Sequence, residues 1–439
     1  MMQLEEPEKQ FAGSGNGLAR NFHKIFGDHR ANIWALAIRG AAVLIGFSVT
    51  YMIGRNFGAV GTGQYALVTQ TAMFLAVAGL LGLDVSVVRH FSKSIAENKP
   101  LALTLVLRIL SVGLAMMVLI IIILQLGGTM VWRPLFGELI PRDLLTVFCI
   151  LVLGRGGVQL LSGLLRSQHR FGLGVGIASL FIPATVAAAL ALGMATTVDE
   201  AMWAAALGGL GAIAIGLLAS SKHIDRGDHA LTIPIKPIML SALPLYGAGL
   251  ALVFGEWYGL AVAARVLGAF DAGLFRVSAQ IAGALLMISS TLFSVYAAQI
   301  STAFHKDNVD DVAQLARSAV RISTALGVPL TFLILIGGKF LLAQIGPEFV
   351  AAQPVLFVLV IGQLFITLTG PSGLVLAMSG NERLNLTISL VGTGVLLVLA
   401  PLAARYGGLT GLALCISTIL ISRNVAAMLF VRYKIGIRL

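Results

Sequence analysis

Continuously apolar runs of about 20 residues recur along the whole chain and limit its possible folds more than any other feature. Such a run matches the length of a helix that crosses the ~30 Å hydrocarbon layer of a membrane. The runs do not alternate apolar and polar residues as barrel strands do, and open sheet edges cannot be satisfied in lipid. Hydrophobic residues make up 58% of the 439 positions and charged residues only 11%. We therefore expect an all-α, polytopic membrane protein with twelve transmembrane helices, at 33–53, 64–84, 104–126, 143–163, 171–193, 200–219, 238–262, 273–297, 318–343, 351–375, 384–405 and 408–431.

The sequence also repeats itself after 210 residues. Aligned pairs include Arg55/Arg265, Gly58/Gly268, Ala59/Ala269, Gly63/Gly273, Gln70/Gln280 and Ser162/Ser372, with Tyr65 aligned to Phe275. Each copy holds six predicted spans, and an even number returns the chain to its starting side, so the two copies have the same orientation. Repeats of this kind are the usual construction of secondary transporters, whose substrate site lies between the halves.

The repeat predicts a division of the chain into two lobes. The polar segment 221–237 contains Gly227, Pro234 and Pro237 and lies where the first copy ends, as a linker would. Residues 1–32 mix apolar and basic residues, which fits either an amphipathic helix on the cytoplasmic leaflet or a frayed tail. The expected organisation is an N-terminal segment at 1–32, an N-lobe at 33–220, the linker at 221–237, a C-lobe at 238–431 and a cytoplasmic tail at 432–439.

Lys and Arg are divided unevenly between the short loops on the two sides of the predicted bundle. With the N-terminus in the cytoplasm, the opposite side holds only Arg55, Arg133, Arg142, Arg265, Lys339 and Arg405. Because basic loops stay in the cytoplasm, both termini are expected there. The formal net charge of +11 is therefore mostly a topology signal. It favours contact with anionic membrane lipids, and no nucleic-acid partner is expected.

Several arginines lie inside the predicted spans, where each costs roughly 2.5–3.5 kcal/mol on an insertion scale. Arg108 and Arg321 lie in the first turns of their helices, where snorkelling to the membrane surface is cheap. Other span arginines are Arg39, Arg155, Arg276 and Arg423, against one clear acid, Glu256. An excess of guanidinium groups within the spans indicates an aqueous cavity that takes an anion.

Arg155 is the best placed of these arginines, near the middle of the fourth span. Gln159 and Ser162 follow it on the same helical face, and a polar stripe has no use against lipid. We expect this stripe to line the transport pathway, with plain helix packing as the alternative. Arg39 lies on a face of small residues that either lines the cavity or packs.

The second copy supplies further candidates. Glu256 and Arg276 lie at similar depth near the outer ends of their spans, so they are expected to pair as a gate, to act in coupling, or simply to cancel charge. Gln280 shares a helical face with Arg276, and Arg423 is a candidate from the last span. The predicted substrate-binding residues are Arg39, Arg155, Gln159, Ser162, Arg276, Gln280 and Arg423, with Glu256 as the gate or coupling residue.

No chemistry beyond binding is indicated. Cys149 and Cys415 lie in spans of different halves, so neither a disulfide nor a metal site is suggested. The predicted outer loops are too short to carry an active site. We expect no catalytic residue, no metal and no cofactor, and the chain is not expected to be an enzyme.

Two segments resemble a known family. IGRNFGAVGTGQYAL at 53–67 and GLDVSVVR at 82–89 are similar to the opening of bacterial polysaccharide-export flippases of the multidrug/oligosaccharidyl-lipid/polysaccharide (MOP) superfamily. The resemblance implies two six-helix lobes that open alternately around a central cavity in the bacterial cytoplasmic (inner) membrane. Its implied substrate is a lipid-diphosphate-linked oligosaccharide for surface polysaccharide biosynthesis, such as lipopolysaccharide or exopolysaccharide. Other polysaccharide-assembly proteins become candidate partners.

Three rival interpretations stay open. A cation-coupled multidrug exporter of the same superfamily would need a buried acid cluster, and only Glu256 is available. A membrane-embedded glycan polymerase or ligase would need a large outer loop. A peptidoglycan-precursor flippase usually has two more spans than this chain.

Overall fold

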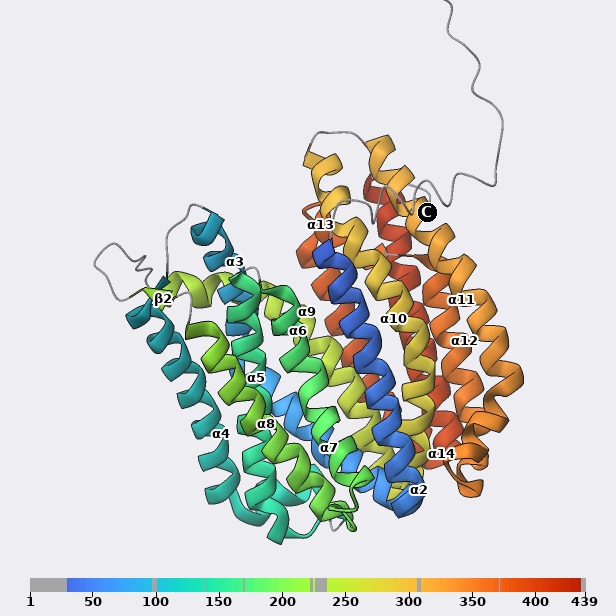
Figure 1. Cartoon of the computed structure of the whole chain (residues 1–439). Helices are drawn as coiled ribbons and strands as arrows, with labels where there is room; N and C mark the ends of the chain where they lie inside the picture. The colour runs from blue at the N-terminus through green and yellow to red at the C-terminus, as the bar shows by residue number, and fades with distance from the viewer. Residues whose placement is uncertain are drawn as a thin grey trace, which may run out of the picture.

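The computed structural model describes residues 30–96, 101–137, 139–168, 170–221, 224–225, 235–305, 309–370 and 372–435. Within these ranges the chain forms a bundle of long helices that run in roughly one direction (Figure 1). Most of the predicted N-terminal segment and of the linker, and half of the tail, lie outside the described residues. The elements are α2 (Arg30–Leu80), α3 (Leu83–Ala96), β1 (Leu101–Ala102), α4 (Leu103–Phe136), η1 (Arg142–Leu144), α5 (Leu145–Ser167), α6 (Phe171–Gly176), η2 (Ile177–Phe181), α7 (Ile182–Ala191), α8 (Val198–Ser220), β2 (Ile224–Asp225), α9 (Ile235–Val262), η4 (Ala263–Leu267), α10 (Ala269–His305), α11 (Val309–Ile345), η5 (Pro347–Ala352), α12 (Gln353–Thr369), α13 (Ser372–Met378) and α14 (Glu382–Ile435).

Three of the long helices are broken by a glycine. Gly58 in α2, Gly128 in α4 and Gly408 in α14 have φ of 68°, 52° and 60°, in the left-handed region that favours glycine. The 51 residues of α2 would measure about 77 Å as one straight helix, far more than a membrane is thick. Instead, α2 folds back at Gly58 into a hairpin (Figure 1).

The helices bear out a multi-pass membrane protein. Ten helices in the described ranges are long and apolar enough to cross a membrane. Two of them, Gly40–Leu80 and Arg383–Lys434, are divided by Gly58 and Gly408, which makes twelve crossings. Large apolar side chains such as Leu44, Leu126 and Ile336 are 70%, 83% and 82% exposed, as side chains that face lipid would be.

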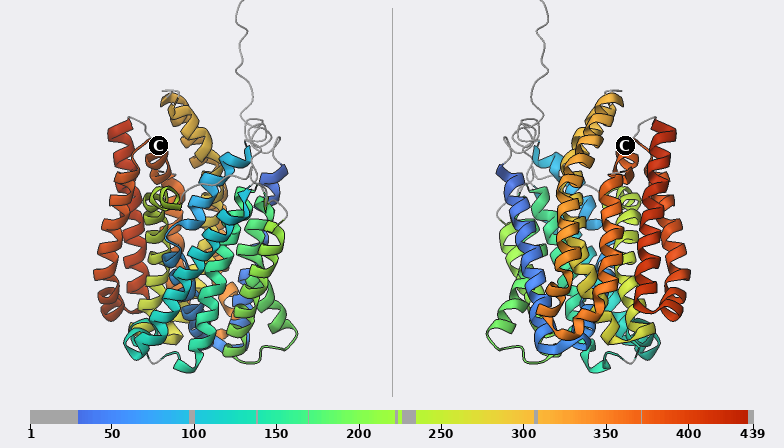
Figure 2. Two further views of the ribbon diagram at one scale, coloured as in Figure 1. Left: turned by 90° about the vertical axis from the view of Figure 1, so that its left-hand side faces the viewer. Right: turned by 90° about the vertical axis from the view of Figure 1, so that its right-hand side faces the viewer.

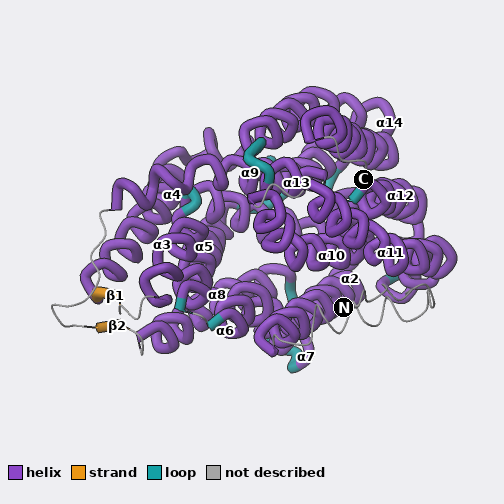
Figure 3. Tube along the Cα trace, turned by 90° about the horizontal axis from the view of Figure 1, so that it is seen from above, coloured by secondary structure: helices purple, strands orange, loops and turns teal. Residues whose placement is uncertain are grey.

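The repeat is visible where α2 and α10 cross. A Cβ atom added to Gly63 would lie 2.0 Å from the carbonyl oxygen of Ala269, and one added to Gly273 would lie 2.0 Å from that of Ala59. These four residues form two repeat-related pairs, so a pseudo-twofold axis passes between the two helix ends. Seen from above, α3–α8 gather on one side of the molecule and α10–α14 on the other (Figure 3).

The two copies differ in one element. In the first copy, Leu81 and Gly82 have φ of 49° and 77° and separate α2 from α3. In the second copy, α10 runs unbroken for 37 residues, and the position equivalent to Gly82 is Leu292. The glycine therefore permits a bend that the second copy lacks.

Part of the predicted linker is attached to the first half. Its residues Ile224 and Asp225 form β2, which pairs in parallel with β1 at Leu101 and Ala102. Since β1 connects α3 to α4, this end of the linker is joined to the N-terminal half. The lobe boundaries stay predictions.

The two sides of the bundle differ. The breaks at Gly58, Gly128 and Gly408 lie at one side, which we call the outer side, following the predicted topology. The end of α10, the start of α11 and both ends of α14 lie at the opposite side, where the helices diverge (Figure 2). There, α10 and α11 form a hairpin that packs with α13 and α14 around a second apolar core, which includes Tyr296, Ile300 and Val312.

Candidate functional site

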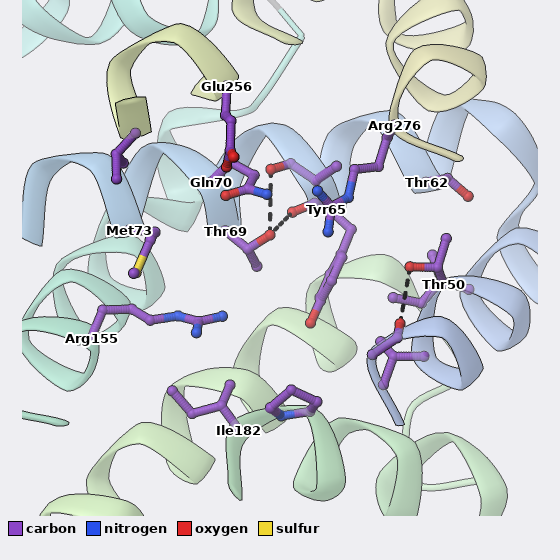
Figure 4. Close-up of a pocket in the computed structure, with 16 residues that line it drawn as sticks. Thr50, Thr62, Tyr65, Thr69, Gln70, Met73, Arg155, Ile182, Glu256 and Arg276 are labelled. Carbon is purple, nitrogen blue, oxygen red and sulfur yellow. Dashed lines mark hydrogen bonds between the residues drawn. The ribbon is translucent and has the colours of Figure 1, made fainter. Parts of the chain in front are cut away.

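A cavity of about 310 Å³ lies between the two halves of the molecule. Side chains from both halves of α2 and from α5, α7, α9 and α10 line it (Figure 4). Its lining residues are Gly46, Val49, Thr50, Ile53, Thr62, Tyr65, Ala66, Thr69, Gln70, Met73, Arg155, Ile182, Pro183, Val253, Glu256 and Arg276.

Arg155 and Arg276 enter this cavity from opposite halves. Arg155 comes from the middle of α5 and Arg276 from near the start of α10, and both point into the space around Tyr65 (Figure 4). Neither guanidinium group makes a hydrogen bond or ion pair with a described residue, and the buried Nε of Arg155 has no hydrogen-bond partner there. The cavity thus presents two unpaired cations.

Glu256 is the one acidic side chain in the lining, and it is exposed to the cavity. It shares this space with Arg276, but no ion pair joins the two groups in this conformation. Two guanidinium groups and one carboxylate leave the cavity with an excess of positive charge. Such a site suits an anion, and the planar fork of each Arg suits phosphate oxygens.

Gln280 lies beside the cavity and connects the halves. Its Oε1 accepts a hydrogen bond of 2.7 Å from the hydroxyl of Thr50, which lines the cavity on the first half of α2. This bond joins the first span to α10 at the level of the site.

Three further predicted binding residues, Gln159, Ser162 and Arg423, do not line the cavity. Gln159 is half-buried on α5. Ser162 is 2% exposed, and its carbonyl accepts a 3.3 Å hydrogen bond from Nε of Arg166 on the same helix. Arg423 donates to the hydroxyl of Ser389 at 3.1 Å within α14. The side chain of Arg39 lies outside the described residues. Of the seven predicted binding residues, the structure therefore brings Arg155 and Arg276 into the cavity and Gln280 to its edge.

Several lining residues were not singled out from the sequence as site residues. Tyr65 is central, and Gln70, Thr62 and Thr69 add polar groups from the second half of α2. The repeat contains a signal for two of them, because Gln70 aligns with Gln280 and Tyr65 aligns with an aromatic residue. Polar residues kept at equivalent positions of two copies are candidates for a shared interface.

Aromatic side chains join α2 to α9 beside the cavity. The indole Nε1 of Trp257 donates a 2.9 Å hydrogen bond to Thr71, and its ring stacks on Phe74 with centroids 4.5 Å apart. Nearer the cytoplasmic ends, the hydroxyl of Tyr246 donates to the carbonyl of Ala78 at 2.6 Å. These contacts hold the halves together on one side of the cavity.

Comparisons with known proteins identify the fold. No protein-family model and no curated protein matches the chain in sequence. An inward-facing multidrug resistance MATE family transporter of the MOP superfamily matches with a TM-score of 0.70 and 15% identity over 92% of this chain and 98% of that chain. An outward-facing structure of such a transporter matches with a TM-score of 0.61 and 15% identity over 94% and 97%.

A third solved structure is a MOP superfamily transporter from Pyrococcus furiosus. Its binding pocket has reverse polarity, which suggests a different function for that protein. It matches with a TM-score of 0.63 and 14% identity over 93% of this chain and 95% of that chain. At these identities the likeness establishes the fold, which is that of MOP superfamily transporters with twelve helices in two lobes.

Proposed function

We propose that the protein is an alternating-access flippase that moves an anionic lipid-diphosphate-linked oligosaccharide outward across the bacterial inner membrane. The observation that carries the proposal is the pair of unpaired guanidinium groups, Arg155 and Arg276, in the cavity between the halves. The family resemblance of residues 53–67 and 82–89 supports the glycan part of the proposal.

The energetics favour an anionic ligand. Each arginine within the membrane costs roughly 2.5–3.5 kcal/mol on an insertion scale, and neither cavity arginine forms a hydrogen bond or an ion pair with a described residue. A diphosphate supplies several charged acceptor oxygens, and arginine binds such groups through paired hydrogen bonds. The arginines come from different halves, so the bound head group would be released when the halves separate.

Reconstituted flipping tests the role of these arginines. We expect Arg155→Ala and Arg276→Ala each to lower the flipping rate of a lipid-diphosphate oligosaccharide in proteoliposomes by at least tenfold, because a charge-assisted hydrogen bond contributes about 1.5–3 kcal/mol. Arg423→Ala is the matched control, since Arg423 is a membrane arginine bonded to Ser389 outside the cavity. Parental rates in the Arg155→Ala/Arg276→Ala double variant would remove the pair from the mechanism.

A multidrug exporter is the second candidate. Solved neighbours of the fold include multidrug resistance transporters, and Glu256 is exposed in the cavity without an ion pair. Under this alternative, cells that carry the protein expel a cationic dye, and Glu256→Gln abolishes efflux while Arg155→Ala does not. Under the flippase proposal, dye efflux is absent and the arginine variants are the defective ones.

A further inference from the structure

The outer side of the molecule is closed by contacts between residues of the two halves. The loop between α11 and α12 approaches the α2 hairpin, where a Cβ atom added to Gly54 would meet Ile345 at 2.4 Å and Phe349 at 3.2 Å. Together with the crossing of Gly63 over Ala269, these contacts hold the outer ends of the halves against each other. Two charged side chains add polar contacts at the same level.

Glu348 caps a helix that belongs to the other half. Its Oε1 accepts a 2.5 Å hydrogen bond from the backbone N–H of Ala59, the first residue after the break in α2. That N–H is one of the donors that a helix start leaves without an internal partner, and a carboxylate is favourable at this end of the helix dipole. A Cβ atom on Gly58 would lie 2.8 Å from the same oxygen, so glycine is needed here both for φ and for space.

Arg265 makes the complementary contact at a helix C-terminus. From η4, which directly follows α9, its Nη1 donates to the carbonyl oxygens of Arg133 and Pro134 in the last turn of α4. A cation is favourable at this end of a helix, where carbonyl groups lack internal partners. The side chain lies over Gly137, whose φ of 64° is in the left-handed region that favours glycine.

Both copies of the sequence repeat contain this arginine and this glutamate at equivalent positions. Arg265 and Glu348 align with Arg55 and Glu138 of the first copy. Arg55 instead donates a 2.8 Å hydrogen bond to the hydroxyl of Tyr51 on its own helix. Glu138 lies outside the described residues. Among the described residues, the arginine contact between halves is therefore made by the second copy alone.

We propose that Glu348 and Arg265 are latches that hold the outer side closed while the cavity is open toward the cytoplasm. The inference deepens the proposed function, since it rests on alternating access. Both side chains are exposed, so water replaces their partners when the halves separate. Each latch therefore shifts the equilibrium between the closed and open forms of the outer side modestly, by about as much as a helix cap does. The latch contact can break when the outer side opens.

Thiol labelling from the outer side measures the bias without any substrate. The reporter is Met73→Cys in the cavity wall, in a chain whose Cys149 and Cys415 are replaced by alanine. A membrane-impermeant maleimide is added to sealed vesicles of known orientation. We expect Glu348→Ala and Arg265→Ala each to raise the labelling rate from the outer side by about three- to tenfold, the range for losing a helix cap or a dipole contact. Labelling from the cytoplasmic side should fall.

Two control substitutions remove the same kinds of side chain, a glutamate and an arginine, from contacts that lie within one half. Glu200 caps the start of α8 through Thr196 and Thr197 of its own half, and Arg55 bonds within its own helix. Glu200→Ala and Arg55→Ala should therefore label at nearly the parental rate. Glu348→Gln and Arg265→Lys repeat the test with smaller changes if an alanine variant fails to accumulate.

Parental labelling in both Glu348→Ala and Arg265→Ala, or an equal rise in the two controls, would overturn the latch assignment. The result is separable from the proposed function. Faster labelling in the latch variants, in a protein that flips no lipid-linked glycan, would support the latches and refute the substrate. Normal flipping with unchanged labelling would refute the latches alone.

Discussion

At the scale of single residues, Gly63 and Gly273 determine how closely the halves approach on the outer side. A Cβ atom at either position would lie 2.0 Å from a backbone carbonyl of the other half, and backbone cannot move aside as a side chain can. We expect Gly63→Ala to destabilise the closed form by about 1–3 kcal/mol, the usual cost of overpacking. The measurement is a lower unfolding temperature of the purified protein in detergent.

Gly283 on α10 is the control for this substitution. Nothing lies within 4 Å of a Cβ added there, so Gly283→Ala should be neutral or stabilise by up to ~1 kcal/mol through helix propensity. Equal stability of Gly63→Ala and Gly283→Ala would contradict the close crossing of α2 and α10.

Residue chemistry predicted the site only in part. Arg155 and Arg276 could be found because a charge within an apolar span needs a polar environment. The same reasoning selected Arg423, which instead bonds Ser389 and lies over Gly392 inside its own hairpin. Periodicity identifies the face of a helix on which a residue lies, but not which neighbour covers that face.

At the scale of elements, span number and helix type followed from the sequence, whereas bends and extensions did not. Each of the twelve apolar runs is long enough to cross the membrane, and the length of a run depends only on its own residues and not on tertiary contacts. The second predicted span ended at residue 84, but the structure breaks at Leu81–Gly82 and starts α3 at Leu83. α10 and α11 are each 37 residues long and extend past their predicted spans, because an apolar core shared with α13 and α14 continues there through Ile300 and Val312.

At the scale of the whole molecule, the halves are joined on the outer side and diverge toward the termini (Figure 2). An anionic head group would then enter from the cytoplasm and leave outward. An inside-negative membrane potential favours that direction by ~2.3 kcal/mol per charge per 100 mV.

Flipping should therefore respond to voltage if the proposed substrate is correct. In oriented proteoliposomes, we expect a potential that is negative on the cytoplasmic side of the protein to accelerate outward flipping of the anionic lipid, and the opposite potential to slow it. An ionophore that collapses the potential should return both rates to the same value. A rate that is indifferent to the sign of the potential would show that no net charge moves in the limiting step.

The sequence alone determined that this chain spans a membrane twelve times as two copies of one unit. Hydrophobic length and internal repetition are properties of the chain itself, and lipid permits few alternatives to helices. Tertiary structure alone decided which arginines share a cavity, that Tyr65 lies between them, and that Glu348 and Arg265 contact the opposite half. Those facts depend on how residues far apart in the sequence meet across an interface, such as Arg265 with Arg133, 132 positions away, and Glu348 with Ala59, 289 positions away. The rotation of the helices and their crossing at Gly63 and Gly273 set that geometry, which cannot be read from the order of residues along the chain.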